Sequence, residues 1–348
     1  MRKLVFAMLP LLLVVFLSTH SLAQMNRKSI KKNNKHLSNF KGKKQGFSKE
    51  KKYNALGVSV SALNYYGDIA PRPQRISTDI SFTRPALGIN FIHRFGPRYS
   101  LQGQFMYGVL KGSDSQSADP TGEPQYRYKR NMSFRNQVME LSVVAVFDLF
   151  ENQATYISRV KWTPYLYLGV AGFTNNPKAQ APANDLTGAS LEEAGKWVKL
   201  RPLGTEGQHS TLDPTDVNFG IKPYKGMQLA IPLGAGARFR INEVMDLWAD
   251  MGFRYTFTDY IDDISQNYVG LEKLNSTLAQ AMSYRTNEIP GQPLNPVMTP
   301  SGIPVEAGYG SEHPDNVRGN KNDKDIYMVT SIRLTYIIGA TLHRAKFR

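Results

Sequence analysis

The chain has 348 residues and a formal net charge of +15, from 43 Lys and Arg against 28 Asp and Glu. It contains no cysteine, which excludes disulfides, thiol catalysis and cysteine-based metal sites. Its 18 tyrosines, 17 phenylalanines and 28 glycines, with few long helical patterns, favour β structure.

Residues 1–23 have the three-part pattern of a secretory signal peptide. Arg2 and Lys3 supply the positive charge, residues 4–17 are apolar, and residues 21–23 form a small-x-small cleavage site. The apolar run is too short to cross a bilayer, which argues against a membrane anchor. We therefore expect an exported protein whose mature chain starts at residue 24.

Residues 24–53 are predicted to be a disordered basic tail. Residues 27–52 carry eleven Lys or Arg against the single acid Glu50, with few apolar residues and no sustained period. Such composition is typical of unfolded, solvated segments. Contact with anionic lipid headgroups or with an acidic partner remains open. A nucleic-acid partner is not expected, because an exported protein rarely meets one.

The next elements are strands, because residues of one kind recur at every second position. In residues 247–257, Leu247, Met251 and Phe253 share one face while Asp250 and Arg254 share the other. This period of two is typical of a strand whose faces meet different surroundings. The pattern predicts eight strands, at 54–66, 83–95, 100–111, 133–150, 161–173, 226–241, 246–260 and 325–340. Residues 161–173 are apolar on both faces and could not be oriented.

The connections between these strands alternate strictly between long and short. Their lengths are 16, 4, 21, 10, 52, 4 and 64 residues in chain order. A transmembrane β-barrel has short periplasmic turns and longer extracellular loops, and no stretch is apolar enough for a transmembrane helix. The sequence therefore predicts an eight-stranded antiparallel outer-membrane β-barrel over residues 54–341, with the long loops 174–225 and 261–324 outside.

Charged residues on the inner face are predicted to form a network of salt bridges. A barrel of eight strands is just wide enough for side chains to fill it, and a buried charge needs a partner. The depth of each residue in the barrel follows from counting positions along strands that alternate in direction. This count places Glu140, Arg254 and Arg333 near mid-height, with Glu140 paired to Arg254. It places Asp148, Asp250, Arg238 and Arg240 nearer the periplasmic rim. We interpret the network as structural and not as a transport path.

An acidic cluster, Asp259, Asp262 and Asp263, lies at the extracellular end of the seventh strand. Three carboxylates could bind calcium, but their spacing does not match an EF-hand loop. A hydrogen-bonded rim, with Asp capping the loop backbone, is favoured. Residues 202–209 are predicted to form a folded turn. This turn could cover the mouth of the barrel, or it could be a surface that binds a partner.

Enzymatic function is not expected, and neither is a cofactor. The chain has no HExxH motif and no Gly-rich phosphate loop after a strand. In the loops, the only His and Ser residues close enough in sequence to suggest a catalytic triad are His209 with Ser210 and His313 with Ser311. Adjacency in sequence does not establish a catalytic geometry.

Six stretches resemble the PorG family, an outer-membrane barrel family of the Bacteroidota tied to type IX secretion. They are LNYYGDIAP (63–71), RPALGINF (84–91), RNMSFRNQVMELSV (130–143), TPYLYLGVAGFTNNPKA (163–179), LRPLGTEGQH (200–209) and FRYTFTDYIDDIS (253–265). PLGTEGQ and TDYIDDIS are the most specific. The resemblance implies a barrel in the cell outer membrane, surrounded by lipid, that anchors or contacts periplasmic secretion-ring proteins; it implies no catalytic, cofactor or metal residue. A surface barrel for adhesion or envelope integrity, and a lipid-modifying enzyme, are the alternative functions.

Overall fold

The computed structural model describes residues 47, 51–69, 80–122 and 125–338. The expected signal peptide at 1–23, most of the tail at 24–53 and the expected barrel end at 339–341 lie outside the described residues. The chain divides into two compact units, residues 1–48 and 49–348. All named strands and helices belong to the second unit.

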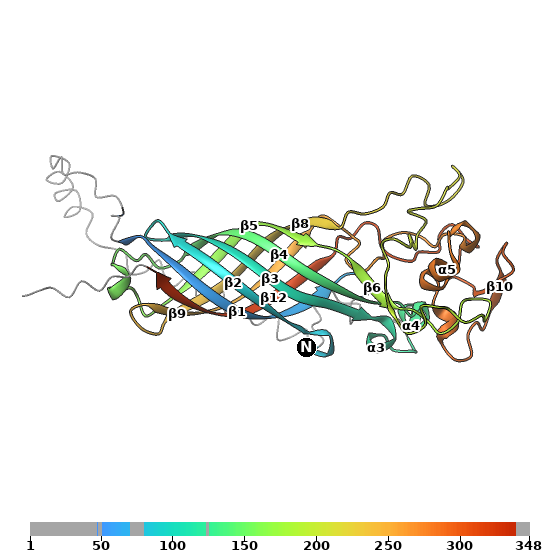
Figure 1. Ribbon diagram of the computed structural model, residues 1–348, viewed down its shortest axis with the longest axis horizontal. Coiled ribbons are helices and arrows are strands. Elements are labelled where there is room, and N and C mark those ends of the chain that lie inside the picture. The colour runs from blue at the N-terminus through green and yellow to red at the C-terminus, as the bar shows by residue number, and fades with distance from the viewer. Residues whose placement is uncertain (1–46, 48–50, 70–79, 123–124, 339–348) are drawn as a thin grey trace, which may run out of the picture. The chain divides into compact units, whose positions relative to one another are not determined.

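Eight long antiparallel strands form a closed barrel (Figure 1). They are β1 (Tyr53–Tyr66), β2 (Arg84–Arg94), β3 (Tyr99–Ser113), β4 (Ser133–Asp148), β5 (Trp162–Thr174), β8 (Met227–Arg240), β9 (Met245–Thr256) and β12 (Ile326–Ile338). Each strand pairs with the next along the chain, and β1 pairs with β12, with Ser59 opposite Arg333. The predicted fold class is confirmed.

Short connections join the strands at one end of the barrel, which we call the turn end, and long connections join them at the other, the loop end. Small elements lie in the connections: η3 (Ile80–Phe82), α3 (Asp114–Ser117), α4 (Gln125–Arg130), η4 (Tyr156–Ser158), β6 (Pro177–Gln180), β7 (Trp197–Lys199), η5 (Leu271–Lys273), α5 (Thr277–Ser283), η6 (Thr286–Glu288), β10 (Pro296–Met298) and β11 (Pro304–Glu306). β6 continues the sheet beside β4, and β7 pairs with β6.

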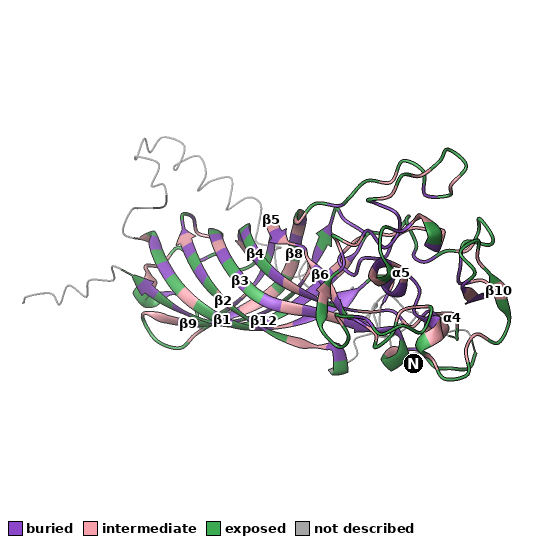
Figure 2. Cartoon of the chain, turned by 45° about the vertical axis from the view of Figure 1, so that its right-hand side comes forward, coloured by how far each residue is buried: buried purple, intermediate pink, exposed green. Residues whose placement is uncertain are grey.

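Burial alternates along the strands, as Figure 2 shows. In β3, Leu101, Phe105 and Tyr107 are exposed, while Gln102, Gln104 and Met106 are buried. Exposed aromatic rings lie near both ends of the apolar band: Phe95, Tyr99, Phe150 and Trp162 at the turn end, Tyr107, Tyr255 and Phe257 at the loop end. The eight residue steps from Tyr99 to Tyr107 correspond to roughly 20 Å along a barrel axis at the usual tilt. This is the surface of a barrel that stands in a lipid bilayer.

Among the described residues, no helix is long and apolar enough to span a membrane.

The structure orients β5, which strand parity left undecided. Leu166, Leu168 and Val170 face outward, and Tyr165 and Tyr167 face inward and are buried. The tyrosine rings fit because glycines face them from β8 and β9. A Cβ added to Gly252 would lie 2.1 Å from the Tyr167 hydroxyl oxygen. A tyrosine counts as apolar in the sequence pattern, although its hydroxyl group can form hydrogen bonds in a polar interior. The pattern therefore did not show which face of β5 points inward.

Candidate functional site

Asp148 joins two arginines at the turn end of the barrel interior. Its Oδ2 accepts hydrogen bonds from Arg94 Nη1 and from Arg238 Nη2, each at 2.7 Å. All three side chains are at most 4% exposed. Arg94 also donates to the Pro97 carbonyl, and the Arg238 guanidinium lies 4.8 Å from the centre of the Trp248 ring. One carboxylate therefore compensates two buried guanidinium groups.

Asp250 forms the second charged contact of this region. It accepts hydrogen bonds from Arg333 Nη2 at 3.0 Å and from the Tyr165 hydroxyl at 2.8 Å. Arg333 also donates to Gln102 Oε1 at 2.6 Å, and its guanidinium lies 5.6 Å from the Trp248 ring centre. We call Arg94, Asp148, Arg238, Asp250 and Arg333 the turn-end network.

Glu140 and Arg254 meet nearer the middle of the barrel. Arg254 Nε lies 3.4 Å from Glu140 Oε2, and both side chains are at most 4% exposed. Tyr327 donates to the same carboxylate at 2.6 Å, and Arg254 donates to the Tyr167 hydroxyl at 3.4 Å. We call Glu140 and Arg254 the central pair. Within the described part of the chain, each member has one polar contact besides its charged partner.

Two expected placements in this network are wrong. Arg333 was expected beside the central pair, but strand register places Ser331 opposite Asp250 and Arg333 opposite Trp248, so Arg333 joins the turn-end network. Arg240 was expected in the network, but it is half-buried and donates to the Ile157 and Arg159 carbonyls at the rim.

Arg94 was not among the residues expected in the network, and neither was the buried pair of Arg159 with Asp246, whose nitrogen and oxygen are 2.6 Å apart. The inward parity of Arg94 at the end of its strand was an available signal. Arg159 lies in a turn, where strand parity gives no information.

A folded layer of loops covers the loop end. We call residues 114–122, 125–132, 200–224 and 257–325 the loop layer. Within it, the two stretches most specific to the family resemblance contact each other: Thr205 Oγ1 donates to Asp263 Oδ2 at 2.6 Å, and Glu206 Oε1 accepts the amide hydrogens of Ser265 and Gln266 at 2.9 and 3.1 Å. Residues 204–208 are a buried part of the layer.

Two arginines hold the loop layer together. Arg318 Nη1 donates to Glu206 Oε1 at 2.9 Å and to the Asp263 carbonyl at 2.7 Å. Arg130 makes a two-pronged contact with Asp114, at 2.8 and 2.9 Å, and also donates to the Arg318 carbonyl at 2.7 Å. All of these side chains are at most 4% exposed. The contacts join segments that are far apart in the chain.

Tyr65, near the end of β1, connects the barrel wall to this layer. Its hydroxyl oxygen lies 2.7 Å from Asp262 Oδ2 and 2.6 Å from Asp325 Oδ1. A hydroxyl group carries one hydrogen and can donate it to only one carboxylate. Burial and neighbouring carboxylates raise the pKa of both Asp262 and Asp325 well above the ordinary value. Each of these buried carboxyl groups therefore binds a proton more readily than an exposed aspartate does.

The predicted acidic cluster does not converge on one point. Asp262 contacts Tyr65 and the Ile264 amide. Asp263 accepts from Thr205 and, at 2.6 Å, from the Tyr224 hydroxyl. Among the described residues, no group of three or more metal-ligating side chains is arranged to hold a metal ion.

Burial also raises the pKa of other carboxyl groups in and beside the loop layer. The pKa of Asp259 rises to about 7 because it is buried. Burial raises the pKa of Asp263 to about 6 against the opposing effect of Arg318, and that of Asp68 to about 6 against that of Arg130. These groups bind protons more tightly when the layer is folded than when it is open.

The loop layer is expected to open more readily as the pH rises. Stability linked to a raised carboxyl pKa is complete below the open-state value of about 4 and is lost as the pH rises through the folded value. Between pH 5 and pH 8, opening should increase at least about tenfold. Hydrogen exchange of residues 257–268, corrected for its intrinsic pH dependence, measures this. Asp259→Asn should weaken the dependence, while Asp119→Asn, at an exposed site, should leave it unchanged.

The two histidines considered for catalysis contact other groups than their neighbouring serines. The exposed His209 ring has Nε2 3.0 Å from the Arg201 carbonyl oxygen. His313 Nδ1 accepts the Asp315 amide hydrogen at 3.2 Å, and its side chain is 62% exposed. Neither arrangement activates a serine nucleophile.

A family model described as a domain of unknown function (DUF6089) matches residues 44–187. No curated protein matches the chain. The chain is similar to the solved structure of Neisserial surface protein A, with 9% identity and a TM-score of 0.33 over 81% of this chain and 96% of that one. It is similar to a major outer membrane protein of Thermus thermophilus, with 12% identity and a TM-score of 0.36 over 82% and 99%. For Ail of Yersinia pestis, the identity is 7% and the TM-score 0.31 over 82% and 97%.

Proposed function

We propose that this chain is a non-enzymatic outer-membrane β-barrel that serves as a membrane-embedded component of type IX protein secretion. In this role it anchors or contacts periplasmic secretion-ring proteins. The observation that carries the proposal is the contact of residues 202–208 with residues 258–265 through Thr205 and Glu206. These two stretches are the most specific part of the resemblance to the PorG family, and they contact each other through buried side chains.

The barrel interior supports an anchoring role over a conducting one. Paired charges occupy the interior at the turn end and in the middle. Buried apolar side chains, among them Leu63, Met106, Phe134 and Phe173, form one cluster, in which Met106 and Phe173 lie opposite Glu140 on the neighbouring strands. A barrel of eight strands leaves no more room than its side chains fill. A partner would therefore use the outer surfaces of the protein.

The turn end offers a rigid surface for such a partner. Arg159 donates to the carbonyl groups of Asn242 and Met245 at 3.2 and 3.3 Å, and it pairs with Asp246. It thereby ties the turn at 149–161 to the turn at 241–244. Rigid backbone lowers the entropy lost on binding, so this end suits a permanent contact with a periplasmic ring.

Photo-crosslinking in intact cells tests the proposal. A photoreactive residue replaces Glu243 or Gln153, which are exposed at the turn end, and Asn184 in a loop serves as the matched control. The turn-end positions should capture identified periplasmic proteins of the secretion ring, and Asn184 should not. Depletion of the protein should stop secretion of type IX substrates. Capture of lipid alone, with secretion intact, would contradict the proposal and favour a surface barrel for adhesion or envelope integrity.

A further inference from the structure

Four cationic side chains form one lateral row on the outside of the sheet. Strand register places Lys111 of β3 opposite Arg135 of β4, Arg135 opposite Lys178 of β6, and Lys178 opposite Lys199 of β7. None of the four is buried. Directly opposed residues of an antiparallel pair point to the same side of the sheet, and like charges there destabilise it. The row therefore has an unfavourable energy unless an anion lies against it.

The row lacks internal compensation in the part of the chain that the structure describes. There, neither its four members nor nearby Arg84 forms a salt bridge with an acidic side chain. The polar contacts of the row are weak ones to amides: Lys111 Nζ lies 3.4 Å from Gln116 Oε1, and Lys178 Nζ lies 3.4 Å from Gln137 Oε1. The positive charge of the row can therefore be compensated by an anion that binds from outside the protein.

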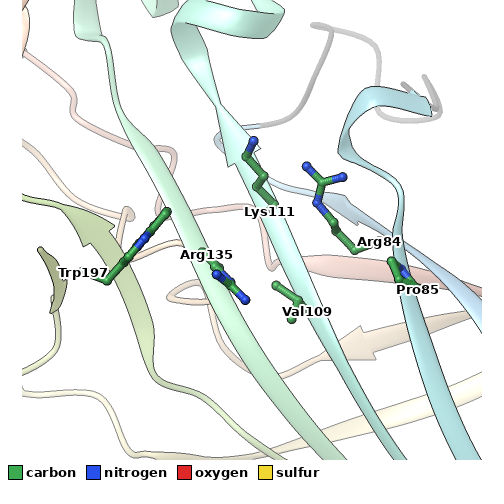
Figure 3. Close-up of a pocket in the computed structure, with 6 residues that line it drawn as sticks. All are labelled: Arg84, Pro85, Val109, Lys111, Arg135 and Trp197. Carbon is green, nitrogen blue, oxygen red and sulfur yellow. The ribbon is translucent and has the colours of Figure 1, made fainter. Parts of the chain in front are cut away.

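A groove of about 430 Å³ begins at this row. It is lined by Arg84 and Pro85 of β2, Val109 and Lys111 of β3, Arg135 of β4 and Trp197 of β7 (Figure 3). The guanidinium of Arg135 lies 5.8 Å from the centre of the Trp197 ring, and the ammonium of Lys111 lies 5.8 Å from that of Phe82. The groove combines three cations with an apolar wall, which suits an amphiphile with an anionic head.

The groove lies where the apolar band ends. Going along β3 towards the loop end, the outward residues are Phe105, Tyr107, Val109 and then Lys111. On β2, the outward Leu87 and Pro85 precede Arg84 in the same direction. Aromatic rings followed by cations mark the boundary between the hydrocarbon core and the lipid headgroups. Arg84, Lys111 and Arg135 therefore lie at headgroup height.

We propose that this groove binds the phosphate-bearing headgroup of an acylated lipid in the outer leaflet. Arg84, Lys111 and Arg135 surround the phosphate, and an acyl chain lies along Val109 and the exposed apolar residues below it. Charge complementarity carries the assignment, because cation clusters at headgroup height bind anionic lipid heads. The proposal rests on the loop end facing the cell exterior. It does not depend on a role in secretion.

Native mass spectrometry of the full chain in a non-ionic detergent tests the proposal. The probes are diphosphorylated lipid A and the same lipid after removal of its phosphates. The phosphorylated form should bind more tightly. The triple variant Arg84→Gln, Lys111→Gln, Arg135→Gln should weaken that binding on the order of 100-fold and leave binding of the dephosphorylated form unchanged. The matched control Lys161→Gln, Lys222→Gln, Lys225→Gln removes equal charge at exposed positions and should bind as the wild type does.

The folded state of each variant is checked by its heat-modifiable migration on gels. Relief of like-charge repulsion should keep the triple variant at least as stable as the wild type. If it does not fold, Arg135→Gln alone should lower the affinity on the order of fivefold. Equal retention of both lipids by the wild type would overturn the proposal. Binding of inorganic phosphate as tight as that of the lipid would also overturn it, because the site would then serve a free anion.

Discussion

Asp148→Ala is expected to be the most destabilising single substitution in the barrel interior. Its Oδ2 is the shared partner of Arg94 and Arg238, which are 1% and 4% exposed. Truncation would leave two guanidinium groups buried without a carboxylate. Breaking a single buried pair costs about 3 to 5 kcal/mol, so the loss in unfolding free energy should reach at least the upper part of that range. The Pro97 carbonyl and the Trp248 ring offset only part of it.

Urea unfolding of the protein from lipid vesicles measures this loss. Glu151→Ala is the matched control, because Glu151 is 45% exposed and lies 3.7 Å from Arg98, itself 36% exposed. Exposed pairs contribute about 0 to 1 kcal/mol, so the control should unfold almost as the wild type does. If Asp148→Ala cost no more than Glu151→Ala, the two arginines would not depend on Asp148 in the bilayer.

Arg254→Ala and Glu140→Ala are each expected to destabilise the barrel by about 3 to 5 kcal/mol. Each substitution leaves the other charge buried, with only Tyr167 or Tyr327 as a polar neighbour. The double substitution removes both charges together. Its cost should therefore be smaller than the sum of the two single costs, which is the signature of a coupled pair.

The same unfolding measurement on the three variants gives the coupling free energy. The double variant Arg254→Ala, Asp148→Ala supplies a comparison, because these residues belong to separate contacts and their effects should add more nearly. Strict additivity for Arg254 and Glu140 would show that they are not coupled. A stabilising Arg254→Leu would place this face of β9 against lipid and reverse its parity.

The strands and their inward faces could be predicted because a bilayer imposes a simple rule on a barrel. Outward residues meet hydrocarbon and inward residues meet a polar interior, so parity alone places Glu140, Asp148 and Arg254 inside. The partnership of Glu140 with Arg254 also followed from counting depth along alternating strands. Which residues face lipid and which face the interior depends only on the alternation within one strand, so it can be predicted from that strand's sequence alone.

The depth of Arg333 and the orientation of β5 could not be predicted for physical reasons. The stagger between neighbouring strands sets which side chains share a layer, and a count along each strand separately does not contain it. Because of that stagger, Arg333 lies in the same layer as Asp250 and forms a salt bridge with it. In β5, Tyr165 and Tyr167 are apolar by composition, yet their hydroxyl groups contact Asp250 and Arg254.

The loop layer could not be predicted because its contacts are non-local and without period. Glu206 contacts Arg318, 112 residues further along the chain, and the amides of residues 265 and 266, 59 and 60 residues further along. The sequence indicated a folded turn at 202–209 and an acidic cluster at 259–263. It gave no sign that the two contact each other through buried side chains.

The placement of the barrel across the outer membrane, with the loop layer outside, is the central claim. Labelling of intact cells with a membrane-impermeant thiol reagent tests it most directly, since the chain has no cysteine of its own. Asn184→Cys and Asn275→Cys, at exposed loop positions, should be labelled, while Glu243→Cys at the turn end and Asn33→Cys in the basic tail should be labelled only after the cells are broken. Labelling of the last two on intact cells, with protection of the first two, would contradict this orientation.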